Sequence, residues 1–322
     1  MSVSVQMRRW GLMATLLAVF SLALVAGLTV GTSTIGFSHL QRWDPVLTQI
    51  RLPRVILAAL AGGGLAAAGV AFQALLRNPL ADPYIVGVSG GAALGGVIGI
   101  VAGVEHPYLL PAFSFFGAAA SVIALFALAH AYGKTDPLTL LLAGVVFNAF
   151  AAAVVTFFKV VVSASKAQEI LYWLVGSVSI QPWGTLGALG VYSLGGLLAL
   201  LFAAGALNLL ALGDEQAASL GLSVASVRLL TFLAAALLVG AVVAVAGMIG
   251  FVGLVVPHVL RLTLGADHRW LLPAATLGGA AFLVLSDVVA RLSFLFLGTE
   301  IPVGAVTAFM GGPFFLLLLL RR

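Results

Sequence analysis

The chain has 322 residues, of which 62% are hydrophobic and 8% are charged. A water-soluble globule of this length needs more polar surface, so the composition excludes a soluble fold. The formal net charge is +5, but the basic residues are scattered at the ends of apolar segments, which argues against nucleic-acid binding. The sequence has no cysteine, which excludes disulfides, cysteine zinc sites and thiol catalysis.

The apolar residues form ten segments, each close to the roughly 20 residues that cross a bilayer. We therefore predict an all-α fold: a polytopic membrane helical bundle of about ten transmembrane helices, forming one domain over residues 1–322. The 38 glycines predict close helix packing. The segments cover residues 10–31, 53–76, 85–104, 110–132, 138–162, 184–212, 228–246, 250–264, 271–292 and 302–320.

The first segment follows Arg8 and Arg9, which leaves a signal peptide or a twin-arginine signal as an alternative. We interpret it as a span, because it is longer than the roughly 7–15 apolar residues of a signal peptide and no small-x-small cleavage site closes it. An even number of spans puts both termini on one side of the membrane.

The distribution of lysine and arginine predicts that this side is cytoplasmic. It places nine basic residues inside: Arg8, Arg9, Arg77, Lys134, Arg228, Arg261, Arg269, Arg321 and Arg322. It leaves six outside: Arg42, Arg51, Arg54, Lys159, Lys166 and Arg291. Arg51, Arg54 and Arg291 lie near the outer ends of spans, where topology disfavours them, so we expect them to have partners.

Three segments depart from a simple span. Residues 168–180 are too few to cross the membrane and predict an interfacial helix at the outer surface. Residues 207–227 form a polar cytoplasmic insertion, in which Gly213 and Gly221 bracket about two helical turns. Residues 247–258 contain glycines and a proline that we expect to break a helix within the membrane, which is tolerated where backbone lines a cavity.

An ion-coupled secondary transporter is one alternative function, since buried ionisable residues in spans serve as ion relays. The candidates are few. Asp287 stands four residues before Arg291 and can pair with it on one helix face, and Glu300 lies at the outer end of the last span. Asp82 precedes Pro83 and is typical of a turn or helix cap.

A rhomboid-like intramembrane serine protease is a further alternative. Ser89 lies between glycines in a local serine motif, with His130 or His258 as a conceivable base. A serine in such a context is more often a packing position. The five histidines are dispersed without zinc-like spacing, so no metal site is predicted.

Several stretches, in order, resemble the FecCD-type permease family, which includes vitamin B12, siderophore and haem permeases. These stretches are RLPR (51–54), QALLRNPLADP (73–83), GVSGGA (87–92), GFVGLVVPHVLR (250–261) and, between 286 and 313, SD, R, IPVG and GGP. Each is weak alone, but together they are specific and extend from residue 51 to the end of the chain.

The resemblance implies the permease of a type II ABC importer in the inner (plasma) membrane of a prokaryote. The chain would have no catalytic residue and no cofactor of its own, because ATP and magnesium would bind to a partner ATPase. The implied partners are a second copy of the chain, two ATPase subunits, an external substrate-binding protein and membrane lipid. Alternating access at the homodimer axis would carry a metal chelate: a ferric siderophore first, then haem or vitamin B12.

The resemblance also implies roles for three groups of residues. Arg51, Arg54 and Arg291 match positions that meet acidic residues of the binding protein. The coupling-helix segment 207–227 would dock onto the ATPase through Asp214, Glu215, Gln216, Ser219, Leu220 and Gly221. The predicted pathway or gate residues are Gly62, Gly63, Gly64, Asn148, Thr156, Gly250, Gly253 and Pro257.

Overall fold

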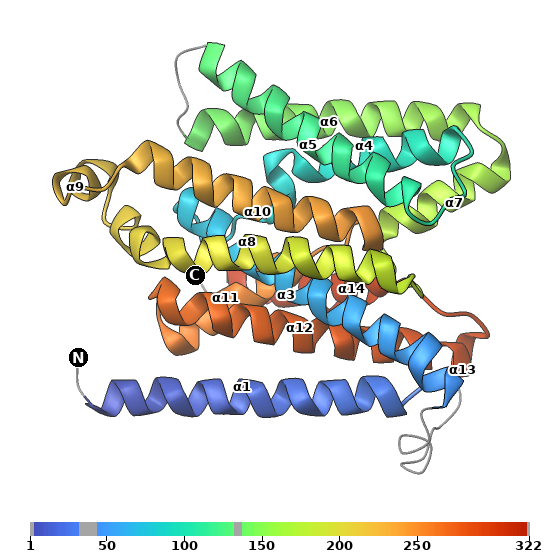
Figure 1. Ribbon diagram of the computed structural model, residues 1–322, viewed down its shortest axis with the longest axis horizontal. Coiled ribbons are helices and arrows are strands. Elements are labelled where there is room, and N and C mark those ends of the chain that lie inside the picture. The colour runs from blue at the N-terminus through green and yellow to red at the C-terminus, as the bar shows by residue number, and fades with distance from the viewer. Residues whose placement is uncertain (1–2, 32–43, 132–136, 321–322) are drawn as a thin grey trace.

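The computed structural model describes residues 3–31, 44–131 and 137–320, and this part of the chain contains helices and no strand (Figure 1). The all-α prediction is therefore confirmed. The elements are α1 (Val3–Thr29), η1 (Val46–Arg51), α3 (Leu52–Leu75), η2 (Pro83–Val86), α4 (Val88–Val101), α5 (Leu109–Ala131), α6 (Pro137–Val161), α7 (Ala164–Val175), α8 (Trp183–Leu210), α9 (Asp214–Ser219), α10 (Val224–Ala246), α11 (Val252–Leu264), α12 (His268–Leu292), α13 (Phe294–Leu297) and α14 (Val303–Leu320).

Among these residues, six helical stretches are long and apolar enough to cross a membrane, and four shorter apolar helices accompany them. Together they correspond one for one to the ten predicted segments. The six long stretches are Gln6–Thr29, Val46–Leu75, Leu141–Val161, Trp183–Leu210, Val224–Ala246 and His268–Leu297. The four shorter ones are Val88–Val101, Leu109–Leu125, Val252–Leu264 and Val303–Leu317.

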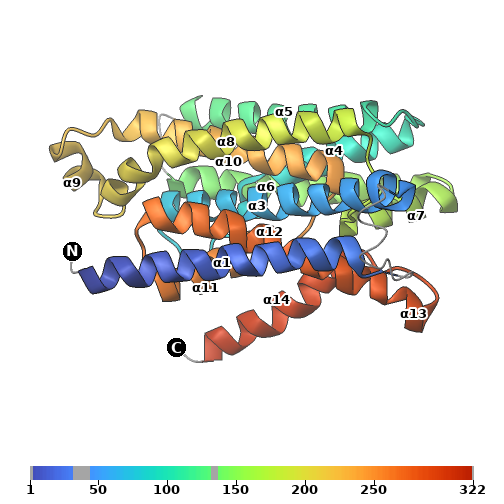
Figure 2. The same cartoon turned by 60° about the horizontal axis from the view of Figure 1, so that its bottom comes forward.

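Helix α3 forms the centre of the bundle and packs against α8, α10, α11 and α12 (Figure 2). Residues 61–73 of α3 are buried without exception. Its closest approach to α12 pairs Gly62 with Gly279, where a Cβ on either glycine would collide with the main-chain oxygen of the other. The helix backbones meet because both positions lack a side chain, which is how small residues bring helices together in lipid.

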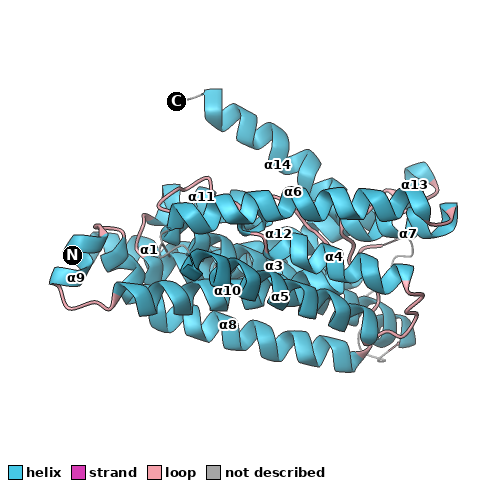
Figure 3. Cartoon of the chain, turned by 90° about the horizontal axis from the view of Figure 1, so that it is seen from above, coloured by secondary structure: helices cyan, strands magenta, loops and turns pink. Residues whose placement is uncertain are grey.

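The long helices run side by side, so the bundle has two ends (Figures 1 and 3). Helix α9 lies at one end with the beginning of α1, and α7 and α13 lie at the other end. Arg77 and Arg228 reach α9, whereas Arg54 and Arg291 lie with Glu300 at the end of α13. This separation agrees with the predicted sidedness, while the cytoplasmic location of the termini stays a prediction. Lys134, Arg42, Arg321 and Arg322 lie outside the described residues.

The three irregular segments are present with some changes. Helix α7 begins at Ala164, earlier than the predicted residue 168, and ends before Gly176, whose φ of 80° takes the backbone out of the helix. Helix α9 lies between Gly213 (φ 123°) and Gly221 (φ 84°), so the predicted bracketing by glycines is confirmed.

The predicted break after α10 is present but shorter than expected. Helix α10 ends at Ala246, and α11 begins at Val252. Pro257 was predicted to contribute to the break, and this prediction was wrong, because Pro257 lies inside α11. A proline within a helix removes one main-chain hydrogen bond without necessarily ending the helix.

Candidate functional site

Three polar arrangements stand out in the apolar bundle: the α9 segment, a charge network at the opposite end, and the break between α10 and α11. In the first, the Asp214 carboxylate pairs with Arg77 at the end of α3 and with Arg228 of α10, the latter at 2.6 Å. Both pairs are partly exposed, so each is worth about 0–1 kcal/mol. Their main effect is to join α9 to two helices that run through the bundle.

The outward face of α9 is available for contact. Glu215, Gln216 and Ser219 are exposed, and the apolar Leu212 and Leu220 are 55% and 61% exposed. By contrast, Ala217 is fully buried and packs the short helix against the bundle. These exposed side chains are therefore accessible to another protein, and the predicted ATPase contact stays a prediction.

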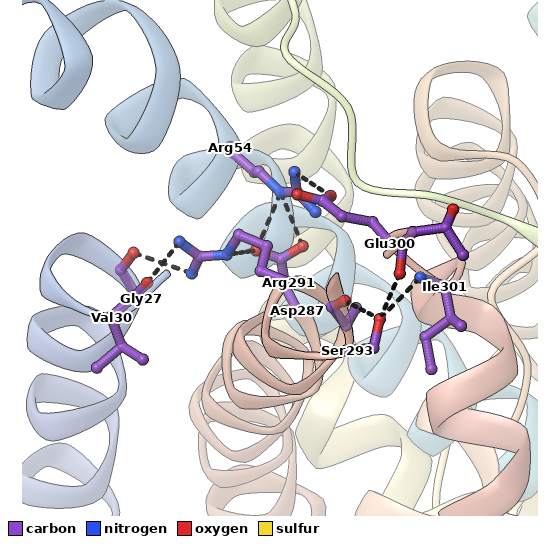
Figure 4. A network of polar contacts seen from close by, with 10 residues as sticks. Gly27, Val30, Arg54, Asp287, Arg291, Ser293, Glu300 and Ile301 are labelled. Carbon is purple, nitrogen blue, oxygen red and sulfur yellow. Dashed lines mark hydrogen bonds and ion pairs between the residues drawn. The ribbon is translucent and has the colours of Figure 1, made fainter. Parts of the chain in front are cut away.

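At the opposite end, Asp287 of α12 is 1% exposed and lies between two arginines (Figure 4). Arg54 Nε donates to both oxygens of its carboxylate at 2.9 and 3.2 Å, and Arg291 Nε lies 3.1 Å from Oδ2. Arg54 also pairs with Glu300 at 2.9 Å. The predicted pairing of Asp287 with Arg291 is therefore confirmed, and the buried carboxylate has the paired neighbours that a buried charge needs.

The end of α1 is held by Arg291 of this network together with Arg51. A helix leaves its last four carbonyl oxygens without partners inside the helix. Here Arg51 and Arg291 donate to carbonyl oxygens in this last turn and just beyond it, at 2.7–3.0 Å, and a positive charge at a helix C-terminus is favourable. The acceptors are Leu28 and Thr29 for Arg51, and Gly27 and Val30 for Arg291.

The three arginines predicted to dock a binding protein therefore have partners within the chain. Arg51 and Arg291 are each 5% exposed, and the Arg54 side chain is 16% exposed. A direct contact of Arg51 or Arg291 with another protein would require them to leave these partners. Their docking role stays a prediction.

At the break, α11 approaches α3 at Gly253. Pro257 has no N–H, so the carbonyl oxygen of Gly253, four residues earlier, lacks its usual helical donor. Gln73 of α3 takes that place, with its Nε2 at 3.4 Å from Gly253 O, while Arg261 Nη2 donates to Gln73 Oε1 at 3.0 Å. Gly69 makes room for this contact, since a Cβ there would collide with Gly253 O.

A second contact at the break joins three helix ends. Ser177 N donates to Ala246 O at 2.8 Å, and Gly304 N donates to Gly176 O at 3.1 Å. A Cβ on Gly247 would collide with Trp173 O, and one on Gly304 would collide with Val175 O. The end of α7, the end of α10 and the beginning of α14 thus touch backbone to backbone.

Tyr84 connects η2 to the same break. Its hydroxyl donates to Ile249 O and accepts from Ile249 N, both at 2.9 Å. Its own carbonyl oxygen accepts from Ser89 Oγ at 2.9 Å and from Asn148 Nδ2 at 2.8 Å. Ser89 is 4% exposed, and its hydroxyl donates to the Tyr84 carbonyl oxygen. The geometry therefore does not support the interpretation of Ser89 as a nucleophile. Asp82 accepts from Tyr84 N at 2.8 Å, which confirms it as a cap.

The predicted pathway residues fall into different environments. The three glycines of α3 and the two residues of α11 are buried in contacts between helices of the same chain, Asn148 and Gly250 are half-buried, and Thr156 is exposed. The pathway role stays a prediction for all eight, and the structure shows a packing role for Gly62, Gly63, Gly64, Gly253 and Pro257. Sequence reasoning assigned no role to Gln73 or Tyr84, although a lone amide inside an apolar span is a recognisable signal.

Comparisons with known proteins find similar permeases over most of the chain. The model of the FecCD transport family matches residues 14–321. The hemin transport system permease protein HmuU of Yersinia pestis is 40% identical over 319 residues, covering 94% of this chain and 95% of that protein. The cobalamin import system permease protein BtuC of Halobacterium salinarum is 43% identical over 284 residues, covering 86% and 74%.

A solved structure is similar as well. It is described as an inward-facing conformation of a metal-chelate type ABC transporter, and it matches with a TM-score of 0.87 at 32% identity, covering 98% of this chain and 100% of that one. The family match extends over nearly the whole chain, and the relatives match over most of their own length. The chain therefore belongs to the FecCD transport family.

Proposed function

We propose that this chain is the membrane-spanning translocation subunit of an ATP-driven importer of metal chelates. The observation that carries the proposal is the family match over residues 14–321, supported by a similar structure of metal-chelate type. In this function the chain performs no covalent chemistry, and a separate ATPase subunit hydrolyses ATP. Its task is to switch between outward-open and inward-open states.

The α9 segment supports this function. The proposed ATPase docks onto the exposed face with Leu212, Leu220 and Glu215, and its closure on ATP moves α9. Because Asp214 joins α9 to α3 and α10, the displacement passes to the central helix and to the helix that ends at the break. The remaining partners are a second copy of the chain and an external binding protein, which we place at the opposite end beside Arg54 and the exposed Glu300.

For the substrate we propose a bulky metal chelate, with a ferric siderophore first and haem or vitamin B12 as the alternatives. The relatives named above are described as hemin and cobalamin permeases, so one scaffold serves several bulky chelates. A wide, weakly binding path suits such cargo, since transport requires release as well as entry.

The test is uptake by the full complex. The chain would be reconstituted in liposomes with its cognate ATPase and binding protein, and accumulation of ferric siderophores, haem and cobalamin would be measured with and without ATP. We expect ATP-dependent accumulation of one chelate that persists when a protonophore is added. Uptake that survives removal of ATP and collapses with the proton gradient would instead establish the ion-coupled alternative.

A further inference from the structure

A groove of about 230 Å³ lies between α5, α8 and α10. Its lining comes from the beginning of α5 and of α8 and from the end of α10, so it lies toward the end of the bundle that carries α7 (Figure 1). Phe115 and Tyr192 stack across it with ring centroids 5.3 Å apart. Phe116, also in the lining, is 68% exposed, so the groove opens sideways from the bundle. Helices α5 and α8 lie on the side away from α14 (Figures 2 and 3).

One buried polar group of this lining has no hydrogen-bond partner among the described residues. Thr185 is 5% exposed, and its Oγ1 makes no hydrogen bond to any described residue. A buried hydroxyl without a partner costs free energy. Water is a poor candidate for that partner, because a buried water needs two to four polar neighbours and the groove is lined mainly by aromatic and aliphatic side chains.

The beginning of α8 adds a second polar feature at the mouth of the groove. Helix α8 starts at Trp183, and no side chain caps it, so its first N–H groups lack side-chain partners and carry a partial positive charge. The Tyr108 hydroxyl lies beside Gly184, 3.0 Å from where a Cβ would stand. Trp183 and Tyr108 are 53% and 48% exposed, as is typical of aromatic residues at the membrane–water interface.

We propose that this groove binds one phospholipid of the surrounding bilayer. Its acyl chain lies along the stacked rings of Phe115 and Tyr192, an ester carbonyl accepts a hydrogen bond from Thr185 Oγ1, and the phosphate lies at the uncapped N-terminus of α8. The ligand must be apolar along most of its length and carry an acceptor at the depth of the interface. Among the molecules that surround a membrane helix, a glycerophospholipid has this order of groups. The proposal requires membrane insertion but not the proposed transport function.

The chain offers a matched pair of variants. Thr185→Val removes the hydroxyl in the groove and keeps the shape. Thr231→Val removes a fully buried hydroxyl of α10 that also has no partner among the described residues but does not line the groove. Ala188→Phe places a ring in the groove from an exposed position. Thermal unfolding in detergent checks that all three variants fold.

The purified full-length chain would be stripped of lipid and titrated with dioleoyl phosphatidylethanolamine, and bound lipid would be counted by native mass spectrometry. We expect one tightly bound lipid per unmodified chain. Thr185→Val should bind it about three- to tenfold more weakly, because one hydrogen bond is lost. Ala188→Phe should bind no such lipid, and Thr231→Val should bind it as the unmodified chain does. A photoactivatable acyl chain should crosslink to residues 108–116 or 185–192. Equal lipid binding by all variants, or crosslinks to other residues, would overturn the proposal. So would an Ala188→Phe variant that keeps its lipid but no longer self-associates, because a second copy of the chain would then be the occupant of the groove.

Discussion

The side-chain amide of Gln73 lies 3.4 Å from the carbonyl oxygen of Gly253, at the position where a main-chain N–H of residue 257 would otherwise donate. Because residue 257 is proline, α11 lacks that donor, and α3 supplies it from 180 positions away in the sequence. The central helix α3 is therefore bound to α11 by a hydrogen bond whose acceptor is free because residue 257 is a proline.

Replacing Gln73 with leucine tests this relationship. The variant leaves Gly253 O without a donor in a buried site, which we expect to lower the free energy of unfolding by about 1–3 kcal/mol. Pro257→Ala in the same chain restores the helical N–H, so the double variant should lose less than the sum of the two single changes. Unfolding in mixed detergent with SDS measures all four proteins, and strict additivity would contradict the proposed substitution of donors.

Gly69→Ala tests the close approach of α3 and α11. Its Cβ would collide with Gly253 O, so the helices must separate, at a cost of about 1–3 kcal/mol. Gly187→Ala is the matched control, because it also lies within a long helix but its Cβ would meet nothing within 4 Å. That control should be neutral or stabilising by up to about 1 kcal/mol, and equal destabilisation of the two variants would show that helix contact is not the cause.

The parts of this fold that were predictable are those fixed by neighbours in the sequence. Hydropathy gave the ten segments, Gly213 and Gly221 marked the ends of α9, and Asp287 and Arg291 are one helical turn apart. The contacts of Arg51 and Arg291 with the end of α1 were not predictable. The Arg291–Gly27 pair is separated by 264 positions, and the apolar composition of a span does not indicate which other span it packs against. The contact of Gln73 was not predictable either, because its partner is a main-chain carbonyl oxygen and every residue carries one.

The capping of α1 predicts a local effect of two arginines. Arg51→Ala removes the donors to Leu28 and Thr29, and hydrogen exchange in the last turn of α1 should accelerate about tenfold or more, since hydrogen bonds to charged groups contribute about 1.5–3 kcal/mol. Arg51→Ala with Arg291→Ala should release that turn further. Arg269→Ala, an exposed arginine at the other end, should leave the exchange there unchanged. Weakened docking of the binding protein with unchanged exchange would favour the direct docking role instead.

The beginning of α1 is held by a carboxylate that titrates. Arg9 pairs with Asp267 at 3.1 Å, and Asn208 donates to the same carboxylate at 2.8 Å. Burial alone would raise the pKa of Asp267, but these contacts and the Arg269 amide outweigh it and hold that pKa below its usual value.

A depressed pKa in the folded state gives stability that is present above the unfolded pKa of about 3.9 and is lost as pH falls through the folded value. We therefore expect α1 to loosen below about pH 4 and to stay attached near neutral pH. Asp267→Asn should remove the pH dependence, as measured by cleavage of the 1–31 segment by an acid protease. Retained pH dependence in that variant would assign the effect to another group.

The anchoring of α9 predicts a separation of ATPase binding from transport. Asp214→Asn weakens the pairs with Arg77 and Arg228 but leaves the exposed face with Leu220 unchanged, so the ATPase should still bind. The stability should change by less than about 1 kcal/mol, because the pairs are near the surface. Uptake per ATP hydrolysed should fall several-fold, since α9 no longer moves α3 and α10 with it.

Glu215→Gln, the control, removes an exposed charge from the same turn and should weaken ATPase binding more than it changes uptake per ATP. If Asp214→Asn couples uptake to hydrolysis as the unmodified chain does, the force must reach the bundle through the main chain flanking α9, because the ion pairs would then carry none of it.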